Sequence, residues 1–274
     1  MRIGTRGSAL ALAQARLADE ALGSGNEIVT VRTTGDADPA RSDKSKWVSE
    51  LERALLDDEI DVAVHSAKDV PAELADGLTL AAVLPREDPR DALCGRRGDG
   101  LRVGTASLRR AAQLRALDPD VEIVALRGNV DTRLRKLADG EADGIVLALA
   151  GLKRLGLEDA VTEVLEIVPA ACQGIVVLQT RTGTELPDIG DEETWRALLA
   201  ERACVRALGA DCESALGVNL AADGRLVAWV GARDGSAWLR DELAVHPPVD
   251  PETLGVQLAE RLLSAGAREL LESA

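Results

Sequence analysis

Short apolar runs alternate along this chain with longer stretches in which apolar residues recur at helical spacing. The first run is residues 2–5, and the stretch after it begins at Ser8 and ends before Gly23. Serine is a frequent first cap of a helix and glycine a frequent stop, so a helix is expected between them. The residues expected on one face of this helix are Leu10, Gln14, Leu17 and Ala21.

The same alternation continues through both halves of the chain and is typical of βαβ units with a mostly parallel sheet. A polar stretch at 33–46 interrupts it and predicts a mobile loop, with a lid as the less favoured alternative. Helices are expected at about 47–56, from Ser107, from Asn129, at 194–208 and from Pro251, where Asp250 is the expected N-cap. Strands are expected at 27–32, 61–64, 101–104, 121–126, 144–148, 174–180, 226–231 and 238–245.

This order of elements predicts an α/β fold with two α/β lobes and a smaller α+β C-terminal domain. A chain of 274 residues is long enough for two or three domains. Because the apolar run near 174–180 follows the second set of units, we expect the chain to return there to the first lobe. The predicted boundaries are 1–86 with 174–190 for the first lobe, 90–168 for the second lobe and 192–274 for the C-terminal domain.

Composition narrows the range of partners. The formal net charge of -15 argues against sequence-independent binding to nucleic acid or to an anionic membrane, since both need a basic face. No apolar run reaches the ~20 residues of a membrane span, and the N-terminus has no signal-peptide pattern, so a cytoplasmic protein is expected. Phe and Tyr are absent, so Leu, Val, Ile and Ala are expected to fill the core.

The four cysteines show neither a C-x-x-C pair nor a histidine at ligand spacing, so no metal site and no disulfide framework is predicted. Cys94, Cys172 and Cys204 are interpreted as packing residues with free thiols. Cys212 lies instead in a polar, turn-like segment, which makes it a candidate nucleophile if a basic pocket favours its thiolate. An ordinary loop cysteine is the alternative.

The segment His65 to Pro71 places a base and an acid directly after the apolar run 61–64. Parallel α/β sheets bind ligands at the carboxyl ends of their strands, so Lys68 and Asp69 are expected to face a ligand in a crevice. A polar turn with a chance salt bridge is the alternative interpretation.

Basic residues recur where predicted strands pass into helices. The residues at these junctions are Arg6, Ser8, Ser107, Arg109, Arg110, Arg127 and Asn129. Helix N-termini favour anions and arginine binds carboxylate or phosphate through two hydrogen bonds, so a polyanionic ligand is predicted. Arg133 and Arg154 are close enough in sequence to reach the same ligand, but each is equally compatible with a solvated surface position.

Several motifs in order resemble those of the porphobilinogen deaminase family, also called the hydroxymethylbilane synthases. The resemblance covers almost the full length, and the segments that carry it are 3–8, 65–71, 86–92, 104–110, 126–130 and 150–157. The lobes also resemble those of periplasmic-type binding proteins, which makes a non-enzymatic small-anion-binding protein, or an inactive variant of the same fold, the alternative function.

The resemblance implies a transferase that joins four porphobilinogen molecules into hydroxymethylbilane, releasing ammonia each time, in tetrapyrrole biosynthesis. It implies a dipyrromethane primer, bound as a thioether to Cys212, and a monomeric enzyme. Asp69 matches the family's catalytic aspartate, expected to stabilise the cationic azafulvene through preorganised electrostatics. The implied primer-binding residues are Lys68, Ser107, Arg109 and Arg110, with Lys68 also placed in the catalytic motif. The implied binders of acetate and propionate groups are Arg6, Ser8, Arg127, Arg133 and Arg154.

The chain also departs from the family pattern. Residues 43–47 lack the two glycines that the family usually has before its second helix, which weakens the expectation of a lid. Ala67 replaces a usual methionine, and Cys172 stands where glycine is common. Asp211 replaces a small glycine beside Cys212 and would tend to raise the pKa of that thiol through like-charge repulsion.

Overall fold

The computed structural model describes residues 1–31, 45–210, 214–244 and 249–272. These residues form two compact units. Unit 1 comprises residues 1–87, 154–156 and 174–195, and unit 2 comprises residues 88–153, 157–173 and 196–274. Unit 1 contains one five-stranded sheet, whereas unit 2 contains a second five-stranded sheet and a three-stranded sheet. The predicted fold class, two α/β lobes with a smaller C-terminal sheet domain, is thereby confirmed.

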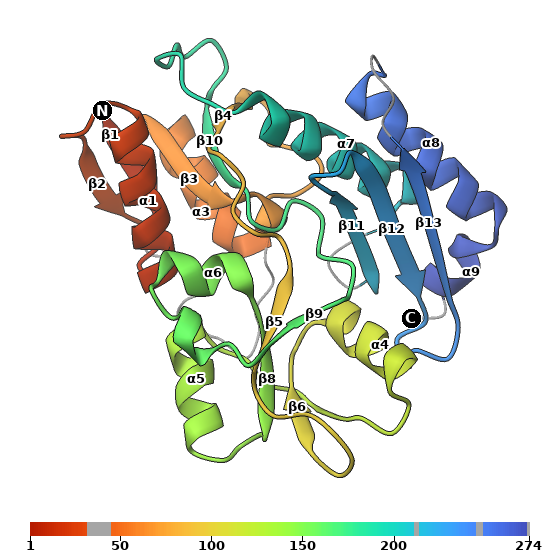
Figure 1. Cartoon of the computed structure of the whole chain (residues 1–274). Coiled ribbons are helices and arrows are strands. Elements are labelled where there is room, and N and C mark those ends of the chain that lie inside the picture. Colours follow the sequence, from red (N-terminus) through yellow and green to blue (C-terminus); the bar gives the residue numbers. More distant parts are fainter. Residues whose placement is uncertain (32–44, 211–213, 245–248, 273–274) are drawn as a thin grey trace. The chain divides into compact units, whose positions relative to one another are not determined.

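The sheet of unit 1 has the strand order β2-β1-β3-β10-β4. Strand β1 is parallel to its neighbours β2 and β3, whereas β10 is antiparallel to β3 and β4. Helices α1 and α3 accompany it, and both can be followed near the N-terminus in Figure 1. The strands are β1 (Arg2–Thr5), β2 (Glu27–Thr30), β3 (Val62–Ser66), β4 (Leu78–Val83) and β10 (Val176–Arg181), and the helices are α1 (Ala9–Ala21) and α3 (Ser45–Leu56).

Helices α1 and α3 pack on opposite faces of this sheet. Val62 and Val64 of β3 join the apolar cluster that contains α1, whereas Ala63 joins the cluster that contains α3. Alternate residues of a strand point to opposite faces, so the two clusters lie on either side of β3. The residues of α1 that are buried here are Gln14, Ala15 and Ala18.

Of the four residues predicted on one face of α1, Gln14 is buried and Ala21 packs against the core, but the prediction was wrong for Leu17. Leu17 is 39% exposed, whereas Ala15 and Ala18 are fully buried. Small alanine side chains allow a helix to approach a sheet closely, and a face chosen for its leucines misses this. The ends of α1 are as predicted: the Ser8 hydroxyl accepts a hydrogen bond from the Ala11 N–H, and Gly23 adopts a positive φ of 100° after the helix.

The five-stranded sheet of unit 2 has the order β7-β6-β8-β5-β9. Strand β6 is parallel to β7 and β8, and β5 is antiparallel to β8 and β9, so the plan of unit 1 is repeated. The strands are β5 (Asp91–Gly95), β6 (Arg102–Gly104), β7 (Glu122–Val124), β8 (Gly144–Ala148) and β9 (Glu163–Leu165), with helices α4 (Leu108–Leu117), α5 (Val130–Ala138) and α6 (Leu149–Arg154). The predicted mostly parallel sheets are thus mixed, because one strand in each runs antiparallel to both of its neighbours.

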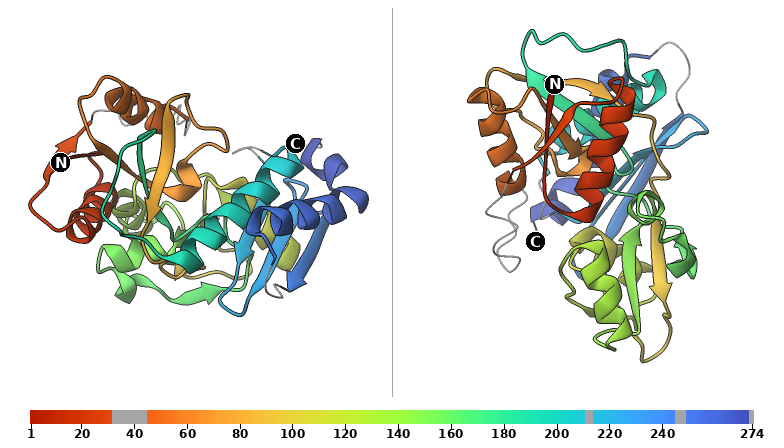
Figure 2. Two further views of the ribbon diagram at one scale, coloured as in Figure 1. Left: turned by 90° about the horizontal axis from the view of Figure 1, so that it is seen from above. Right: turned by 90° about the vertical axis from the view of Figure 1, so that its left-hand side faces the viewer.

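The three-stranded sheet of unit 2 is antiparallel and consists of β11 (Leu216–Leu220), β12 (Arg225–Gly231) and β13 (Trp238–Ala244). Helices α8 (Pro251–Ser264) and α9 (Ala267–Glu272) lie along it, as Figures 1 and 2 show, and α7 (Glu192–Leu208) contributes to the same core. The predicted start of α8 is confirmed, since Asp250 accepts a hydrogen bond from the Thr253 N–H and Pro251 is the first helical residue. On the other side of this sheet, Trp229 packs on Ala112 of α4.

The core is built from aliphatic side chains, as predicted. The largest fully buried side chains among the described residues are all leucine or isoleucine. No helix in the described part of the chain is long and apolar enough to cross a membrane.

Candidate functional site

Unit 1 brings four of the predicted site residues to one edge of its sheet. Arg6 and Ser8 follow the carboxyl end of β1, and Lys68 and Asp69 lie in a 3-10 turn (Ala67–Asp69) directly after β3. Because β1 and β3 are parallel neighbours, their carboxyl ends lie at the same edge. All four side chains are partly buried. The Ser8 hydroxyl is also the cap of α1, so this residue has a structural role in addition to the predicted one.

Hydrogen bonds on both faces of the sheet fix the end of β3. On the α1 face, the Ser66 hydroxyl lies 2.8 Å from the Gln14 Nε2 donor. On the α3 face, His65 Nε2 lies 3.0 Å from Gln179 Oε1, and Gln179 Nε2 donates to Glu52 Oε1 at 2.9 Å. The two residues before the 3-10 turn are therefore anchored, and the turn that carries Lys68 and Asp69 leaves a rigid strand.

The buried imidazole of His65 makes the stability of the protein depend on pH. Burial lowers the pKa of His65 from 6.5 to about 4, and the hydrogen bond that His65 donates to the Gln179 amide oxygen offsets this only in part. An unfolded chain has the ordinary value, so between these pH values the unfolded state binds more protons and stability falls as the pH falls. The loss amounts to about 3 kcal/mol once the folded pKa is reached.

We therefore expect a His65→Gln variant to lose less stability than the parent chain between pH 6.5 and pH 4. Urea unfolding midpoints at several pH values measure the stability of each chain. Carboxylates titrate in both chains, so subtracting one pH dependence from the other leaves the contribution of His65. Equal pH dependence in the two chains would show that the imidazole is not held neutral by burial.

In unit 2, the predicted arginines at the start of α4 are buried on a carboxylate. Arg109 and Arg110 are 4% and 6% exposed, and Asp91, the first residue of β5, is fully buried between them. Asp91 Oδ2 lies 2.8 Å from Arg109 Nη1, and Asp91 Oδ1 lies 2.7 Å from Arg110 Nη2. Burial alone would raise the pKa of Asp91, but the two guanidiniums outweigh burial and lower it. The carboxylate is thus ionised, and this cluster carries a net positive charge.

Arg109 and Arg110 contact Asp91 with different nitrogen atoms of their guanidinium groups. Arg110 directs Nε and Nη2 at Asp91 Oδ1, and its Nη1 donates to the Val146 carbonyl at 2.9 Å. Arg109 uses Nη1 for both Asp91 and the Val168 carbonyl, at 2.8 Å each. The fork of Arg109, formed by its Nε–H and Nη2–H, donates to no acceptor in the described part of the chain. Such a fork fits a carboxylate.

The remaining predicted residues of unit 2 extend this positive region. Ser107 caps α4 by accepting from the Arg110 N–H, and Asn129 is the residue before α5. Arg133 donates from Nε to the Gly128 carbonyl at 2.7 Å. The pKa of Arg133 is lowered to about 10, mainly by burial and to a smaller extent by the positive charges of Arg110 and Arg127. Arg133 therefore lies close enough to Arg110 and Arg127 to be repelled by them, an arrangement that favours an anionic ligand.

Arg154 falls in unit 1, where its Nη2 donates to the Gly174 carbonyl at 2.6 Å. Arg154 is partly buried, and burial lowers the pKa of its guanidinium. The negative charge of Glu87 offsets this lowering in part.

Three of the cysteines lie in the described part of the chain, and all three are buried, as expected for packing residues. Burial raises the pKa of Cys94 to about 11, and burial together with Glu201 raises that of Cys204 to about 12, so both thiols are poor nucleophiles. Cys172 is also buried and has a left-handed φ of 60°, a conformation that glycine adopts more readily than other residues. Cys212 and Asp211 lie outside the described residues, between the end of α7 and the start of β11.

Sequence reasoning missed the polar residues that hold the site. Asp91 lies in the family-like segment 86–92 and begins β5, and an acid at the start of a buried strand signals a buried partner. Gln14 and Gln113 had a weaker signal, namely a polar residue on the buried side of an alanine-rich helix, whereas Gln173 and Gln179 lie outside helices. The missed residues are Gln14, Glu52, Asp91, Gln113, Gln173 and Gln179.

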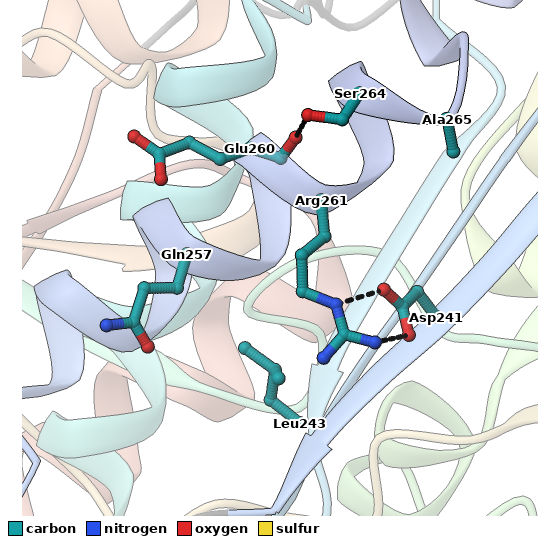
Figure 3. A pocket seen from close by; sticks show the side chains of 7 residues that line it. All are labelled: Asp241, Leu243, Gln257, Glu260, Arg261, Ser264 and Ala265. Carbon is teal, nitrogen blue, oxygen red and sulfur yellow. Dashed lines mark hydrogen bonds and ion pairs between the residues drawn. The ribbon is translucent and has the colours of Figure 1, made fainter.

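A surface hollow lies on the C-terminal sheet and helix of unit 2. It is shallow and open, and it is lined by side chains of β13 and α8, including Asp241, Leu243 and Arg261 (Figure 3). Arg261 is already paired with Asp241 at 2.7 Å. None of the predicted site residues lines this hollow, so it adds nothing to the candidate site.

Comparison with known proteins agrees with the motifs. Residues 1–187 match the family model described as porphobilinogen deaminase, dipyromethane cofactor binding domain. The porphobilinogen deaminase of Roseiflexus castenholzii is 43% identical, with 99% of this chain and 98% of that protein covered. That of Thermus thermophilus is 41% identical, with 98% of this chain and 97% of that protein covered.

Similar solved structures add little. The periplasmic VFT2 domain of Bordetella pertussis BvgS is 17% identical over 74% of this chain and 86% of its own, with a TM-score of 0.39, which is too low to support an argument. The sequence relatives cover nearly the whole chain at far higher identity. On these matches, the chain belongs to the porphobilinogen deaminase family.

Proposed function

We propose that this protein is a transferase that joins four porphobilinogen molecules into hydroxymethylbilane on a dipyrromethane primer bound covalently through Cys212. The observation that carries the proposal is the family match over residues 1–187, together with relatives of the same name across nearly the full length. The proposal extends to a monomeric cytoplasmic enzyme.

The residues of unit 2 fit a ligand with several carboxylates. The Asp91 cluster has two guanidiniums for one carboxylate, and Arg127 and Arg133 add further positive charge near Arg110. The open fork of Arg109 supports its proposed role in binding a primer carboxylate. When bound, the dipyrromethane would supply the pyrrole carbon on which the product is built.

The residues of unit 1 fit the chemistry of deamination. Loss of ammonia from porphobilinogen breaks a carbon–nitrogen bond and leaves positive charge on the pyrrole. Asp69 lies at the end of a strand that is anchored on both faces, and its carboxylate would stabilise that charge and accept a hydrogen bond from the pyrrole N–H. Because His65 is neutral near pH 7, it adds no positive charge that would compete for Asp69. Arg6, Ser8 and Arg154 would bind the acetate and propionate groups of the substrate.

The direct test is to incubate the purified protein with porphobilinogen and to measure ammonia and linear tetrapyrrole together. The proposal expects four ammonia molecules for each tetrapyrrole. Binding of porphobilinogen without release of ammonia would favour a small-anion-binding protein or an inactive variant of the same fold.

A further inference from the structure

Gln113 occupies a buried position on the same face of α4 as Arg109. It lies four residues after Arg109, which is about one helical turn, and it is 4% exposed. A buried amide needs hydrogen-bond partners, since leaving its polar atoms unpaired is unfavourable. Its partners show what the side chain does.

Both polar atoms of the Gln113 amide bind the backbone of one residue. Gln113 Nε2 donates to the Val168 carbonyl at 2.9 Å, and the Val168 N–H donates to Gln113 Oε1 at 2.8 Å. The pair of bonds fixes the orientation of the amide and holds the Val168 backbone against α4. Arg109 Nη1 donates to the same carbonyl oxygen at 2.8 Å. Gln113 and Arg109 therefore share one acceptor.

That acceptor helps to determine which edge of Arg109 is available. Arg109 Nη1 donates to the Val168 carbonyl and forms an ion pair with Asp91 Oδ2, so both contacts hold this nitrogen, and the Nε and Nη2 fork is left for a ligand. Asp91 is itself held by Arg110 and by the Gln173 amide, which donates to Asp91 Oδ1 at 2.9 Å. The Val168 carbonyl is held differently: it accepts from Gln113 and Arg109, and the neighbouring Pro169 carbonyl accepts from the Val218 N–H of β11 at 3.0 Å. Gln113 is the α4 side chain that binds both the carbonyl and the N–H of Val168.

We infer that Gln113 is a positioning residue that holds the fork of Arg109 ready for a primer carboxylate by fixing the Val168 carbonyl. The inference rests on the proposed function, because it takes the ligand of the fork to be the primer. Gln113 itself contacts no ligand in this account. Its removal should lower the rate of primer acquisition only as far as it disturbs Arg109.

A double-mutant cycle tests this dependence. The variants are Gln113→Leu, Arg109→Lys and the double variant. The measured quantity is the rate at which primer-free protein acquires its primer from porphobilinogen. Intact mass follows this reaction at a temperature well below the unfolding temperature of each variant. Arg109→Lys keeps the charge but removes the fork. We expect Gln113→Leu alone to lower the rate at least tenfold, and to lower it by less than twofold in the Arg109→Lys background. If Gln113→Leu lowers the rate of primer acquisition by the same factor with Arg109 and with Lys at position 109, the inference is overturned.

The matched control is Arg115→Met on the same helix. Arg115 Nη1 donates to the Arg233 carbonyl at 2.9 Å, whereas the Val168 carbonyl accepts from Arg109 and Gln113, so this variant loses an α4 hydrogen bond elsewhere. It should acquire primer at the parental rate. If Arg109→Lys also has the parental rate, the assignment of Arg109 in the proposed function fails, which is a result distinct from failure of the Gln113 inference.

A measurement without turnover covers the case in which a variant acquires no primer. The Nε–H cross-peak of Arg109 in a ¹H–¹⁵N spectrum can be assigned by its loss in Arg109→Lys. We expect it to be unchanged in Arg115→Met, and shifted or broadened in Gln113→Leu, with Gln113→Met used if the leucine variant does not fold. An unchanged cross-peak in the folded Gln113 variant would overturn the inference by itself.

Discussion

Replacement of Asp69 by asparagine is expected to lower kcat by about 10² to 10³-fold, with the fold and the bound primer retained. Asparagine keeps the size of the side chain and one acceptor oxygen but removes the negative charge. A preorganised group aimed at developing charge contributes an effect of this size in other enzymes. The reduction should appear in kcat rather than KM, because the charge on the substrate develops only as ammonia leaves.

The surroundings of Asp69 support a large effect. It lies partly buried at the carboxyl end of β3, and the strand before it is anchored through Ser66 and His65. A charge held in a partly buried, rigid position interacts more strongly with a bound cation than a mobile surface charge does.

A carboxylate in the same unit gives the control for Asp69. Asp76 is exposed at the turn before β4, and Asp76→Asn makes the same change of charge. Steady-state kinetics on both variants, with intact mass to verify equal primer content, make the comparison. If Asp69→Asn turned over within threefold of Asp76→Asn, the carboxylate would have no catalytic role.

Replacement of Asp91 by asparagine is expected to lower the free energy of unfolding by about 3 to 5 kcal/mol. The change leaves Arg109 and Arg110 buried without a counter-charge, and loss of one partner from a buried ion pair typically costs this much. The neutral amide also places an N–H₂ group among donors from Arg109, Arg110 and Gln173. Destabilisation of unit 2 therefore combines lost attraction with unpaired donors.

An exposed ion pair in the same unit supplies the comparison for Asp91. Asp223 pairs with Arg225 at 2.7 Å, but both side chains are about half exposed, at 50% and 51%. Asp223→Asn should cost no more than about 1 kcal/mol. Urea unfolding followed by tryptophan fluorescence measures both, since Trp229 packs on Ala112 of α4 beside the cluster. Equal midpoints for the two variants would show that Asp91 does not hold the arginines together.

The periodic pattern predicted the longer helices and the parallel strands, but it missed the short helices α6 and α9 and several strands, among them β4, β5, β9 and β11. Strand β5 is buried along most of its length, so it shows no apolar and polar alternation, and β9 has only three residues. Strand direction has no local signal either, because it is set by which neighbours a strand joins. The return strand near 174–180 was expected, but its antiparallel pairing could not be.

The candidate site was predictable in its residue types and not in its contacts. The positions of Lys68 and Asp69 directly after β3 followed from the apolar run 61–64, and that they face a ligand stays a prediction. The different contacts of Arg109 and Arg110 did not follow, since they depend on Asp91 and on Val168, which are distant in sequence. A guanidinium at a helix start looks the same in a sequence whether it is exposed or buried on a carboxylate.

The most direct test of the account is the intact mass of the purified protein, with peptide mapping across Cys212. The account predicts an added mass of two linked pyrrole units on the peptide that contains Cys212, either as purified or after incubation with porphobilinogen. The peptides that contain Cys94, Cys172 and Cys204 should be unmodified, because these thiols are buried. A chain that stays unmodified after incubation with porphobilinogen would contradict a primer-dependent transferase.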